Sequence, residues 1–451
     1  MISRPRIIWQ VLKTPLISAV LLAALMGSSA AADDGDGQAT GSESVAKAGR
    51  PNVVLIISDD HAWTDYGFLK SPQARTPNID RLAAEGLTFT RGYVTTALCS
   101  PSLATMLTGL YPHQHGITGN DPVKGTPRAA WLDPFFELPL LPQLLADAGY
   151  RTLHTGKLWM GTPARVGFTD DMGPTGRHGG QALAIGRETM QPIYEVIDNA
   201  QQEQQPFFVW YAPFLPHTPH NPPARLLEKY AEIEDPKQAK YLAMVEWLDE
   251  TCGDLMDHLR EQGLDENTLV LYLADNGWNE SGKGFPYENG VRTPLIVRWP
   301  AKVSARIDRE HLASNVDVMP TLLAACGIAA PESLPGVNLL DKQAVASRDT
   351  IYLSNFAHDM VSPSEPEKSL WTRSCIHGNW KLIVWQDPTP AVRPYNHGFR
   401  RKNPGQTWEL FDLKTDPHET TNLAEQHPEI VRDLQERLDR WWNPTAPDKS
   451  D

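Results

Sequence analysis

The apolar positions along this chain fall either in short continuous runs or in longer helical repeats. Residues 53–57, VVLII, form a continuous run, which is typical of a strand buried on both faces of a parallel sheet. Further strands are expected at 150–155, 207–211, 269–274 and 295–299, and helices at 78–85, 140–148 and 238–262. Because strands and helices alternate, the pattern predicts an α/β fold with a mostly parallel sheet flanked by helices.

The pattern changes after residues 331–335, where turn-forming residues gather. Beyond them, strand-like segments follow one another without helices between them. These segments are 350–354, 374–376, 380–384 and 408–413, and a helical repeat at 428–442 comes last. We therefore expect a small C-terminal antiparallel sheet with one helix. The main α/β domain would cover 50–345, the C-terminal subdomain 346–443 and a tail 444–451.

The N-terminal segment has the three parts of a secretory signal peptide. Arg4, Arg6 and Lys13 are basic, residues 16–26 are an apolar run, and 30–32 are alanines suited to cleavage. Such a run is too short for the roughly 30 Å of a bilayer, although an uncleaved anchor is the alternative. The prediction is an exported protein, periplasmic or secreted, with a signal at 1–32. Residues 33–49 are polar, small and acidic, and we expect a disordered linker there.

Charge narrows the range of partners. The 451 residues carry a formal charge of −14, which becomes −17 once the three basic residues of the signal are lost. This acidity argues against nucleic acid or an anionic membrane as a general partner. No stretch after the signal approaches the roughly 20 apolar residues that cross a bilayer, so no membrane contact is expected after cleavage. An anionic substrate would need a local concentration of cations.

Four cysteines occur, at positions 99, 252, 326 and 375. They are far apart and form no CxxC motif, so the sequence indicates neither a zinc cluster nor a disulfide framework. Cys326 lies in the apolar run TLLAACGIA and is expected to be a buried core thiol.

Two polar pairs follow predicted strands. Asp59 and Asp60 come after the first strand, and Asp275 and Asn276 come after the strand at 269–274. In open α/β sheets ligands bind beyond the carboxyl ends of the strands. Together the pairs offer four hard oxygen ligands, which select Ca²⁺ or Mg²⁺ over zinc. Acidic pairs after strands are common as helix caps, so each pair alone is weak evidence for a site.

The segment CSPSLATMLTGLYPHQHG, residues 99–116, also suggests chemistry. Pro101 and Ser102 suit the first turn of a helix, which would place Cys99 at its N-terminus. Helix N-termini attract anions, and a thiol there could be a reactive nucleophile. The alternative is a structural cysteine beside an ordinary cap.

Several motifs in one order resemble the formylglycine-dependent type I sulfatases (arylsulfatase-like enzymes of the alkaline phosphatase superfamily), from about residue 52 to 422. The motifs are NVVLIISDDHAWTDYG, TPNIDRLAAEGLTFTRGYV, CSPSLATMLTGLYPHQHG, TGKLWMG, PHTP, DNG, GKGFPYENGVRTPLIVRWP and WELFDLKTDPHETTNLA. The resemblance implies an alkaline-phosphatase-like α/β fold, with the catalytic domain in the 50–345 region.

The resemblance also implies roles for individual residues. The metal, usually Ca²⁺ and alternatively Mg²⁺, would be held by Asp59, Asp60, Asp275 and Asn276. Cys99 aligns with the cysteine that a maturation enzyme oxidises to formylglycine, whose hydrate also touches the metal. Lys157, His217 and Lys283 align with groups that grip the sulfate and the leaving oxygen. A metal and two lysines would stabilise the developing negative charge, and His217 would act as general acid.

Two positions depart from the family pattern. Leu103 replaces the arginine of C-x-P-S-R, and Trp159 replaces the histidine of G-K-x-H-x-G. In the family, the arginine belongs to the signal read by the formylglycine-generating enzyme and also clamps the nucleophile. The histidine is the base that helps to release sulfate. His154, on a predicted strand, is a poor substitute for it.

Three functions follow from these observations. The first is a sulfatase acting on a sulfated sugar or aryl sulfate. The second is a catalytically silent protein that binds sulfated glycan through the metal and the lysines. The third is a phosphodiesterase or phosphonate-ester hydrolase on the same fold. Specificity would come from loops such as 162–186 and from the C-terminal subdomain, and no feature indicates an oligomeric state.

Overall fold

The computed structural model describes residues 49–173, 175–176, 179–278, 282–386 and 402–445. The predicted signal peptide at 1–32 lies outside the described residues, as do nearly all of the linker at 33–49 and most of the tail at 444–451. Residues 45–451 belong to one unit. Among the described helices, none combines the length and apolar character that crossing a bilayer requires. The boundary at 345/346 stays a prediction.

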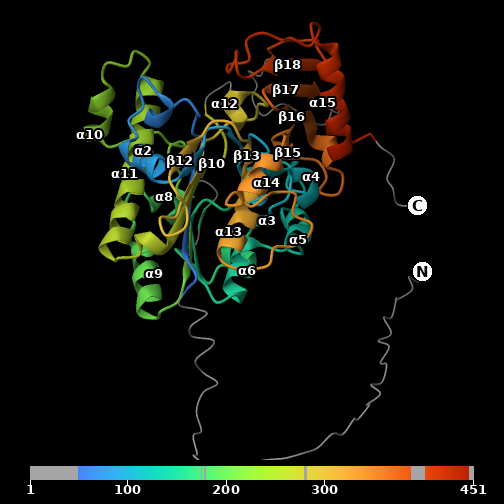
Figure 1. Cartoon of the computed structure of the whole chain (residues 1–451). Coiled ribbons are helices and arrows are strands. Elements are labelled where there is room, and N and C mark those ends of the chain that lie inside the picture. The colour runs from blue at the N-terminus through green and yellow to red at the C-terminus, as the bar shows by residue number, and fades with distance from the viewer. Residues whose placement is uncertain (1–48, 174, 177–178, 279–281, 387–401, 446–451) are drawn as a thin grey trace, which may run out of the picture. The chain divides into compact units, whose positions relative to one another are not determined.

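The main sheet of this unit has eight strands (Figure 1). Their order is β12 (Arg306–Asp308), β2 (Leu87–Phe89), β11 (Leu295–Arg298), β10 (Thr268–Ala274), β1 (Asn52–Ser58), β9 (Phe207–Ala212), β5 (Arg151–Gly156) and β6 (Asp170–Asp171). From β10 to β6 all neighbours are parallel, whereas β11 runs antiparallel to both β10 and β2. The predicted mostly parallel α/β sheet is therefore confirmed.

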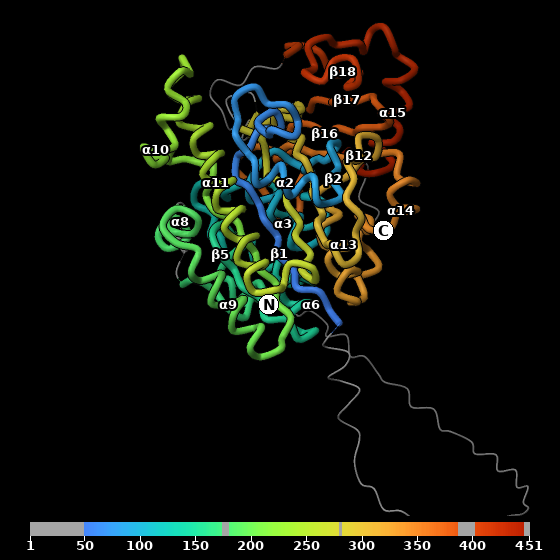
Figure 2. Tube along the Cα trace, turned by 60° about the vertical axis from the view of Figure 1, so that its left-hand side comes forward, coloured from blue at the N-terminus to red at the C-terminus, as the bar shows by residue number. Residues whose placement is uncertain are grey.

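Helices cover both faces of this sheet (Figures 1 and 2). One layer consists of α2 (Pro77–Glu85), α9 (Gln191–Gln202) and α11 (Pro236–Glu261). The other consists of α3 (Cys99–Thr108), α6 (Leu141–Asp147) and α13 (Val318–Ala325). Two hydrophobic clusters fill the spaces between the sheet and these layers.

The central strand β1 shows why this sequence forms a sheet covered by helices on both faces. Val53, Leu55 and Ile57 belong to the cluster on the α3 side, and Val54 and Ile56 to the cluster on the α11 side. Successive side chains of a strand point to opposite faces, so a strand covered on both faces must be apolar at every position. In Figure 2, β1 runs upward from the bottom of the unit, and its carboxyl end lies in the upper half.

The C-terminal sheet is antiparallel throughout. Its order is β14 (Thr350–Phe356), β16 (Leu370–His377), β17 (Trp380–Trp385) and β18 (Trp408–Asp412), with α15 (Pro428–Trp441) packed against it. This confirms the predicted small sheet with one helix. A further hydrophobic cluster joins this sheet to α12 (Glu288–Val291) through residues such as Tyr287, Val291 and Ile383.

Shorter elements connect these layers. They are β3 (Gly92–Tyr93), α4 (Pro112–His115), β4 (Asp121–Pro122), α5 (Ala129–Phe135), α7 (Pro163–Val166), β7 (Thr175–Gly176), β8 (Gly179–Gly180), α8 (Gln181–Ala184), α10 (Ala224–Leu227), β13 (Ala313–Ser314), α14 (Lys342–Ser347), β15 (Asp359–Met360) and the 3₁₀ turns η1 (Gly67–Leu69), η2 (Glu228–Tyr230), η3 (Asp265–Asn267), η4 (Asn315–Asp317) and η5 (Pro366–Ser369). All four cysteines are free and buried, as expected for Cys326 and as the lack of a disulfide framework predicts.

Candidate functional site

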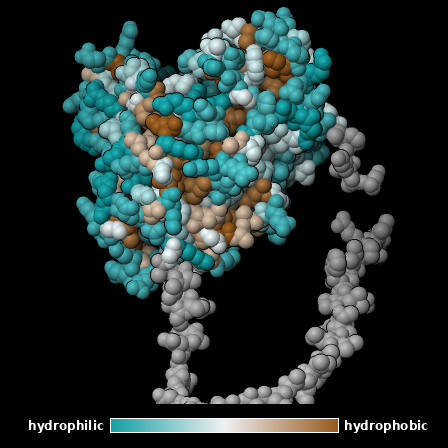
Figure 3. Space-filling model, in the orientation of Figure 1, coloured by the Kyte–Doolittle hydropathy of each residue, from teal (hydrophilic) through white to brown (hydrophobic). Residues whose placement is uncertain are grey.

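Four adjacent parallel strands end at one edge of the main sheet, and each is followed by a polar side chain of the predicted site. Asp275 follows β10, Asp59 follows β1, and Lys157 follows β5. His217 lies five residues beyond β9. Because the strands are parallel neighbours, their carboxyl ends lie side by side. Figure 3 shows the surface of this unit hollowed at the top, between the side of α10 and the side of β18.

The carboxylates are buried and linked through the backbone. The Asp60 backbone amide donates to Asp275 Oδ1 at 3.1 Å, and the side-chain amide of Asn276 donates through Nδ2 to Asp60 Oδ1 at 2.7 Å. Asp60 has φ 59°, in the left-handed region that a non-glycine residue seldom adopts. Such strain is held where the surrounding contacts fix it, often at functional sites.

Two lysines offset part of the negative charge of this cluster. Lys157 Nζ, fully buried, donates to Asp59 and to Asp275 Oδ2, the latter at 3.0 Å. Lys283 Nζ donates to both oxygens of Asp60, at 2.7 and 2.9 Å. Three carboxylates and two ammonium groups leave one net negative charge. A divalent cation would therefore reverse the charge of the cluster to positive.

Burial and the neighbouring charges shift the pKa values of the three carboxyl groups. Burial raises the pKa of Asp275 to about 6, although Lys157 opposes the shift. Burial likewise raises the pKa of Asp59 against the attraction of Lys157. Burial would also raise the pKa of Asp60, but Lys283, His217 and Lys157 together hold it below its usual value. Asp59 and Asp275 are thus harder to ionise than Asp60 unless another cation joins them.

His217 faces the same cluster. Its Nε2 lies 3.6 Å from Asp60 Oδ2, and its Nδ1 lies 2.6 Å from the Thr218 carbonyl oxygen. Burial lowers the pKa of His217 to about 4, against the attraction of Asp60. The ring is therefore neutral at pH 7, with the Nδ1 hydrogen directed at the carbonyl and the Nε2 lone pair toward the cluster.

Cys99 opens α3, as the sequence predicted. It is buried, and its Sγ lies 3.9 Å from Asp60 Oδ1. Asn120 Oδ1 accepts from the Ser100 amide at 3.0 Å, which satisfies one of the free donors of this helix end. Burial raises the pKa of Cys99 to about 12, so its thiol is protonated at neutral pH. The unmodified thiol is therefore poorly suited to nucleophilic attack.

The segment after β5 places Lys157 and Trp159. Gly156 has φ 75°, and a Cβ there would lie 2.0 Å from the Ala212 carbonyl oxygen, so only glycine fits. The Lys157 amide donates to that same oxygen at 2.8 Å. Trp159, at φ 67°, places its ring centroid 4.8 Å from Lys157 Nζ, a cation–π contact.

Leu103 and Trp159 share one environment. Leu103 is fully buried in the hydrophobic cluster on the α3 side, and Trp159 packs against that cluster. The two positions at which the sequence departs from the family pattern are thus both apolar parts of one core.

Two polar contacts near Cys99 escaped the sequence analysis. Arg128 donates to the carbonyl oxygens of Trp159, at 3.1 Å, and Asn120, at 3.2 Å. Through Asn120 and Trp159 it braces the start of α3 and the segment after Lys157. Arg128 and Asn120 stand in none of the motifs found in the sequence, so no sequence signal indicated these contacts.

The donors present fit a hard divalent ion. Asp59 Oδ2 and Asn276 Oδ1 are buried and lack a hydrogen-bond partner among the described residues. Buried oxygens without partners are costly and are rare in native proteins, so a ligand is the simplest account of both. Atoms of Asp59, Asp60 and Cys99 also lie within 4.8 Å of one another, close enough to share one ion.

Comparison with known protein families supports a function for this arrangement. Residues 51–328 match the family model described as Sulfatase. Residues 275–393 match the model described as N-sulphoglucosamine sulphohydrolase, C-terminal. The first match contains every residue of the predicted site.

Individual proteins agree with the family models. The chain is 28% identical to human arylsulfatase A over 87% of this chain and 88% of that protein. It is 24% identical to an N-acetylgalactosamine-6-O-sulfatase of Bacteroides thetaiotaomicron over 86% and 93%. The crystal structure of Ps i-CgsB in complex with k-i-k-neocarrahexaose has the same fold, with a TM-score of 0.69 at 24% identity over 89% of this chain and 95% of that one.

Proposed function

The chain belongs to the sulfatase family and is a sulfuric ester hydrolase, and we propose that it cleaves sulfate esters of carbohydrates with one Ca²⁺ and a formylglycine made from Cys99. The observation that carries the proposal is the buried cluster of three carboxylates, two lysines and Cys99 at the carboxyl edge of four parallel strands.

The metal would be held by Asp59, Asp60, Asp275 and Asn276. When bound, it supplies positive charge that stabilises negative charge on the sulfate oxygens. Two of these residues already offer oxygens without hydrogen-bond partners, Asp59 Oδ2 and Asn276 Oδ1. Carboxylate and amide oxygens are the ligands that Ca²⁺ prefers, and Mg²⁺ is the alternative.

The lysines and His217 would act on the substrate. Lys157 and Lys283 approach the cluster from different segments and are suited to bind a sulfate between them. His217 is neutral as it stands, so its predicted role as general acid requires the bound substrate's negative charge to raise its pKa. The Thr218 carbonyl holds its Nδ1, which leaves Nε2 to face the leaving oxygen.

Conversion of Cys99 would remove the difficulty that its thiol presents. A thiol whose pKa is raised to about 12 supplies almost no thiolate at pH 7. A hydrated aldehyde at this position supplies a hydroxyl nucleophile instead. Cys99 lies at the N-terminus of α3, where the helix dipole favours developing negative charge.

The relatives favour carbohydrate as the carrier of the ester. One of them is named for N-acetylgalactosamine 6-sulfate, and a structural neighbour was solved with a hexaose. We therefore propose a sulfated sugar as substrate, with aryl sulfates as convenient probes. The predicted export would bring the protein to such extracellular material.

One experiment tests this proposal. Protein from the native host is digested with trypsin, and the mass of the peptide spanning Cys99 is measured by mass spectrometry. Hydrolysis of 4-nitrophenyl sulfate, N-acetylgalactosamine 6-sulfate and a bis-aryl phosphodiester is then compared. Formylglycine with faster sulfate-ester cleavage supports the proposal. An intact thiol without turnover favours a glycan-binding protein, and faster phosphodiester cleavage favours a phosphodiesterase.

A further inference from the structure

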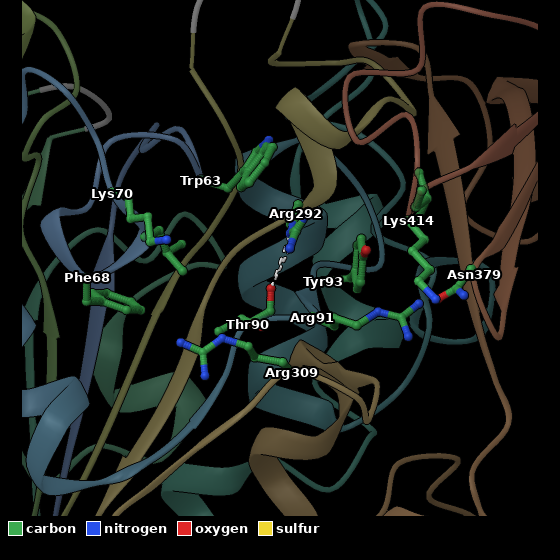
Figure 4. A pocket seen from close by; sticks show the side chains of 12 residues that line it. Trp63, Phe68, Lys70, Thr90, Arg91, Tyr93, Arg292, Arg309, Asn379 and Lys414 are labelled. Carbon is green, nitrogen blue, oxygen red and sulfur yellow. Dashed lines mark hydrogen bonds between the residues drawn. The ribbon is translucent and has the colours of Figure 1, made fainter.

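A separate pocket, lined by cationic side chains, lies at the same edge of the main sheet. A pocket of about 370 Å³ is lined by twelve residues (Figure 4), which include the five cations Lys70, Arg91, Arg292, Arg309 and Lys414. No aspartate or glutamate belongs to the lining. In a chain with a formal charge of −14, such a concentration of positive charge calls for an explanation.

Most of these cations have no carboxylate partner. Arg292 is ion-paired with Glu288 at 3.4 Å. Among the described residues, no carboxylate oxygen lies within ion-pair distance of Lys70, Arg91, Arg309 or Lys414. Arg91 donates only to the backbone carbonyls of Glu310 and Gly378. Four like charges around one cavity repel one another, and a bound anion would relieve that repulsion.

The cations come from different parts of the chain. Lys70 ends the turn η1, Arg91 lies between β2 and β3, Arg309 follows β12, and Lys414 follows β18. Figure 4 shows Arg91 and Lys414 extending toward one another, with Lys70 on the opposite wall. The segments that join and follow the strands of the C-terminal sheet thus contribute one wall of the pocket, and the other walls come from segments that follow β1, β2, β12 and α12.

Apolar surface accompanies the charge. Trp63, Phe68 and Tyr93 also line the pocket. Arg292 covers the Trp63 ring at 4.1 Å from its centroid and donates to the Thr90 carbonyl at 3.0 Å, which fixes this wall. Aromatic walls with a few charged groups suit a sugar ring that carries an anionic substituent better than a small free anion.

The distance between the pocket and the carboxylate cluster suits a ligand of several sugars. β2, after which Thr90 and Arg91 line the pocket, is two strand spacings from β10 and three from β1, which is about 10 and 14 Å across the sheet. Trp63 follows Asp60 by three residues, so the loop after β1 connects the two sites. This separation is too long for one sulfate ester and is suited to a glycan of several sugars.

We propose that this pocket binds a sulfate or carboxylate group of a polyanionic glycan at a sugar other than the one whose ester is cleaved. The assignment rests on the proposed function, because it names the substrate as a polysulfated oligosaccharide rather than a single sulfated sugar. The pocket then determines which sugar of the bound oligosaccharide lies over the metal site.

The test is a binding measurement that needs no turnover. A fluorescently end-labelled chondroitin sulfate hexasaccharide is mixed with the full chain, and its anisotropy is read within seconds. The pocket variant is Lys70→Gln/Arg309→Gln/Lys414→Gln. The control variant, Lys237→Gln/Lys240→Gln/Lys342→Gln, makes the same charge change at exposed positions elsewhere. All six side chains are exposed, so both variants are expected to fold.

The pocket variant should bind the hexasaccharide roughly tenfold or more weakly, since it loses charge-assisted contacts. The control variant and a charge-retaining Lys70→Arg/Lys414→Arg variant should bind like the wild type, and the chemically desulfated hexasaccharide should bind poorly. Equal weakening in both triple variants, or none in either, would overturn the proposal. So would displacement of the hexasaccharide by an equal concentration of inorganic sulfate. Binding without hydrolysis would refute only the proposed function.

Discussion

At the scale of single residues, the site is organised by an excess of negative charge. Asp59, Asp60 and Asp275 lie beside only two lysines, and burial holds the pKa of Asp275 at about 6. A divalent ion would bring these carboxylates to full ionisation, so binding should release protons.

Replacing one ligand tests the metal assignment. Asp275→Ala removes an oxygen ligand and a partner of Lys157, so the variant should lose detectable Ca²⁺ binding. Calorimetric titration of stripped protein with Ca²⁺ measures this, and wild type should bind one ion per chain. Asp133→Ala, at an exposed position on α5, is the control and should bind as wild type does. A wild type that binds no divalent ion would refute the site.

The two departures from the family pattern lead to a second prediction. With Leu103 in place, the maturation enzyme should recognise the segment poorly, and Trp159 supplies no base for sulfate release. The variant Leu103→Arg/Trp159→His, co-expressed with a maturation enzyme, should gain formylglycine and turnover. One well-placed polar group is worth about 10²–10³ in rate, and two acting on one nucleophile need not add.

The single variants serve as controls for that gain. Leu103→Arg alone would bury a guanidinium in the hydrophobic cluster against which Trp159 packs, so it should lower the free energy of unfolding. Intact-peptide mass spectrometry and 4-nitrophenyl sulfate hydrolysis are the measurements. Unaltered protein that already carries full formylglycine and matches the double variant in rate would contradict the prediction.

The sequence predicted that Asp59 and Asp275 lie close together, but not which side chains pair with them, and the roles of the site residues stay predictions. Motif spacing and the carboxyl ends of strands brought Asp59 and Asp275 to one edge, and the structure has them there. That Lys157 bridges these two carboxylates while Trp159 covers it could not be predicted, because both contacts depend on the backbone turn at Gly156. The sequence likewise could not indicate that Asp59 Oδ2 and Asn276 Oδ1 lack hydrogen-bond partners, because this depends on the folded structure.

At the scale of elements, α2 depends on a residue from another helix. Asp249 of α11 accepts from the amides of Asn78, at 3.0 Å, and Ile79, at 2.8 Å. Thr76, the residue before α2, makes no side-chain cap. The side chain of Asp249 is buried and acts as the cap that the helix itself lacks.

Asp249→Ala should therefore destabilise the fold by about 1–3 kcal/mol, since it leaves buried amide donors without partners. Urea unfolding measures the change. Asp254→Ala, at an exposed position on the same helix, is the matched control and should have little effect. Equal losses in both variants would show that helix α11 itself, rather than the cap, was weakened.

Most long elements could be predicted from the sequence, and the shortest ones could not. The central strands and α11 agree with the apolar pattern to within two residues at most ends. β2 and β12 have three residues each, which is too short for any periodicity. Helix α9 was missed although Ile193, Val196, Ile197 and Ala200 form a helical stripe.

At the scale of the whole described unit, a buried ion network joins the C-terminal sheet to the segment after Lys283. Lys381 of β17 contacts Glu288 of α12, at 3.0 Å, and Glu419, at 2.8 Å, and all three side chains are essentially inaccessible. Burial would lower the pKa of Lys381, but the two glutamates raise it. The same sheet provides Lys414 to the cationic pocket, so its attachment bears on binding as well as on stability.

Replacing Lys381 should lower the free energy of unfolding, because two buried carboxylates lose their shared cation. Lys381→Met removes the nearest cation from the buried carboxylates of Glu288 and Glu419, and Arg292 at 3.4 Å and Lys402 at 4.0 Å are more distant partners. The loss should lower the free energy of unfolding by about 3–5 kcal/mol near neutral pH. Burial already raises the pKa of Glu419 against the attraction of Lys381, and the variant loses that attraction. A carboxyl whose pKa is higher in the folded than in the unfolded state favours folding when protonated. The deficit should therefore grow as pH rises above the pKa of Glu419 in the folded wild type, which itself lies above the usual value.

Urea unfolding at pH 5 and pH 8 measures this dependence on pH. The deficit of Lys381→Met should be smaller at the lower pH, and Lys381→Met/Glu419→Gln should recover part of it at the higher pH, because one uncompensated charge is gone. Lys342→Met, at an exposed position on α14, is the control and should show no deficit at either pH. A deficit that is equal at both pH values would mean that Lys381 acts through packing of its hydrocarbon stem. The C-terminal sheet would then be attached by the hydrophobic cluster around Tyr287 and Ile383 rather than by charge.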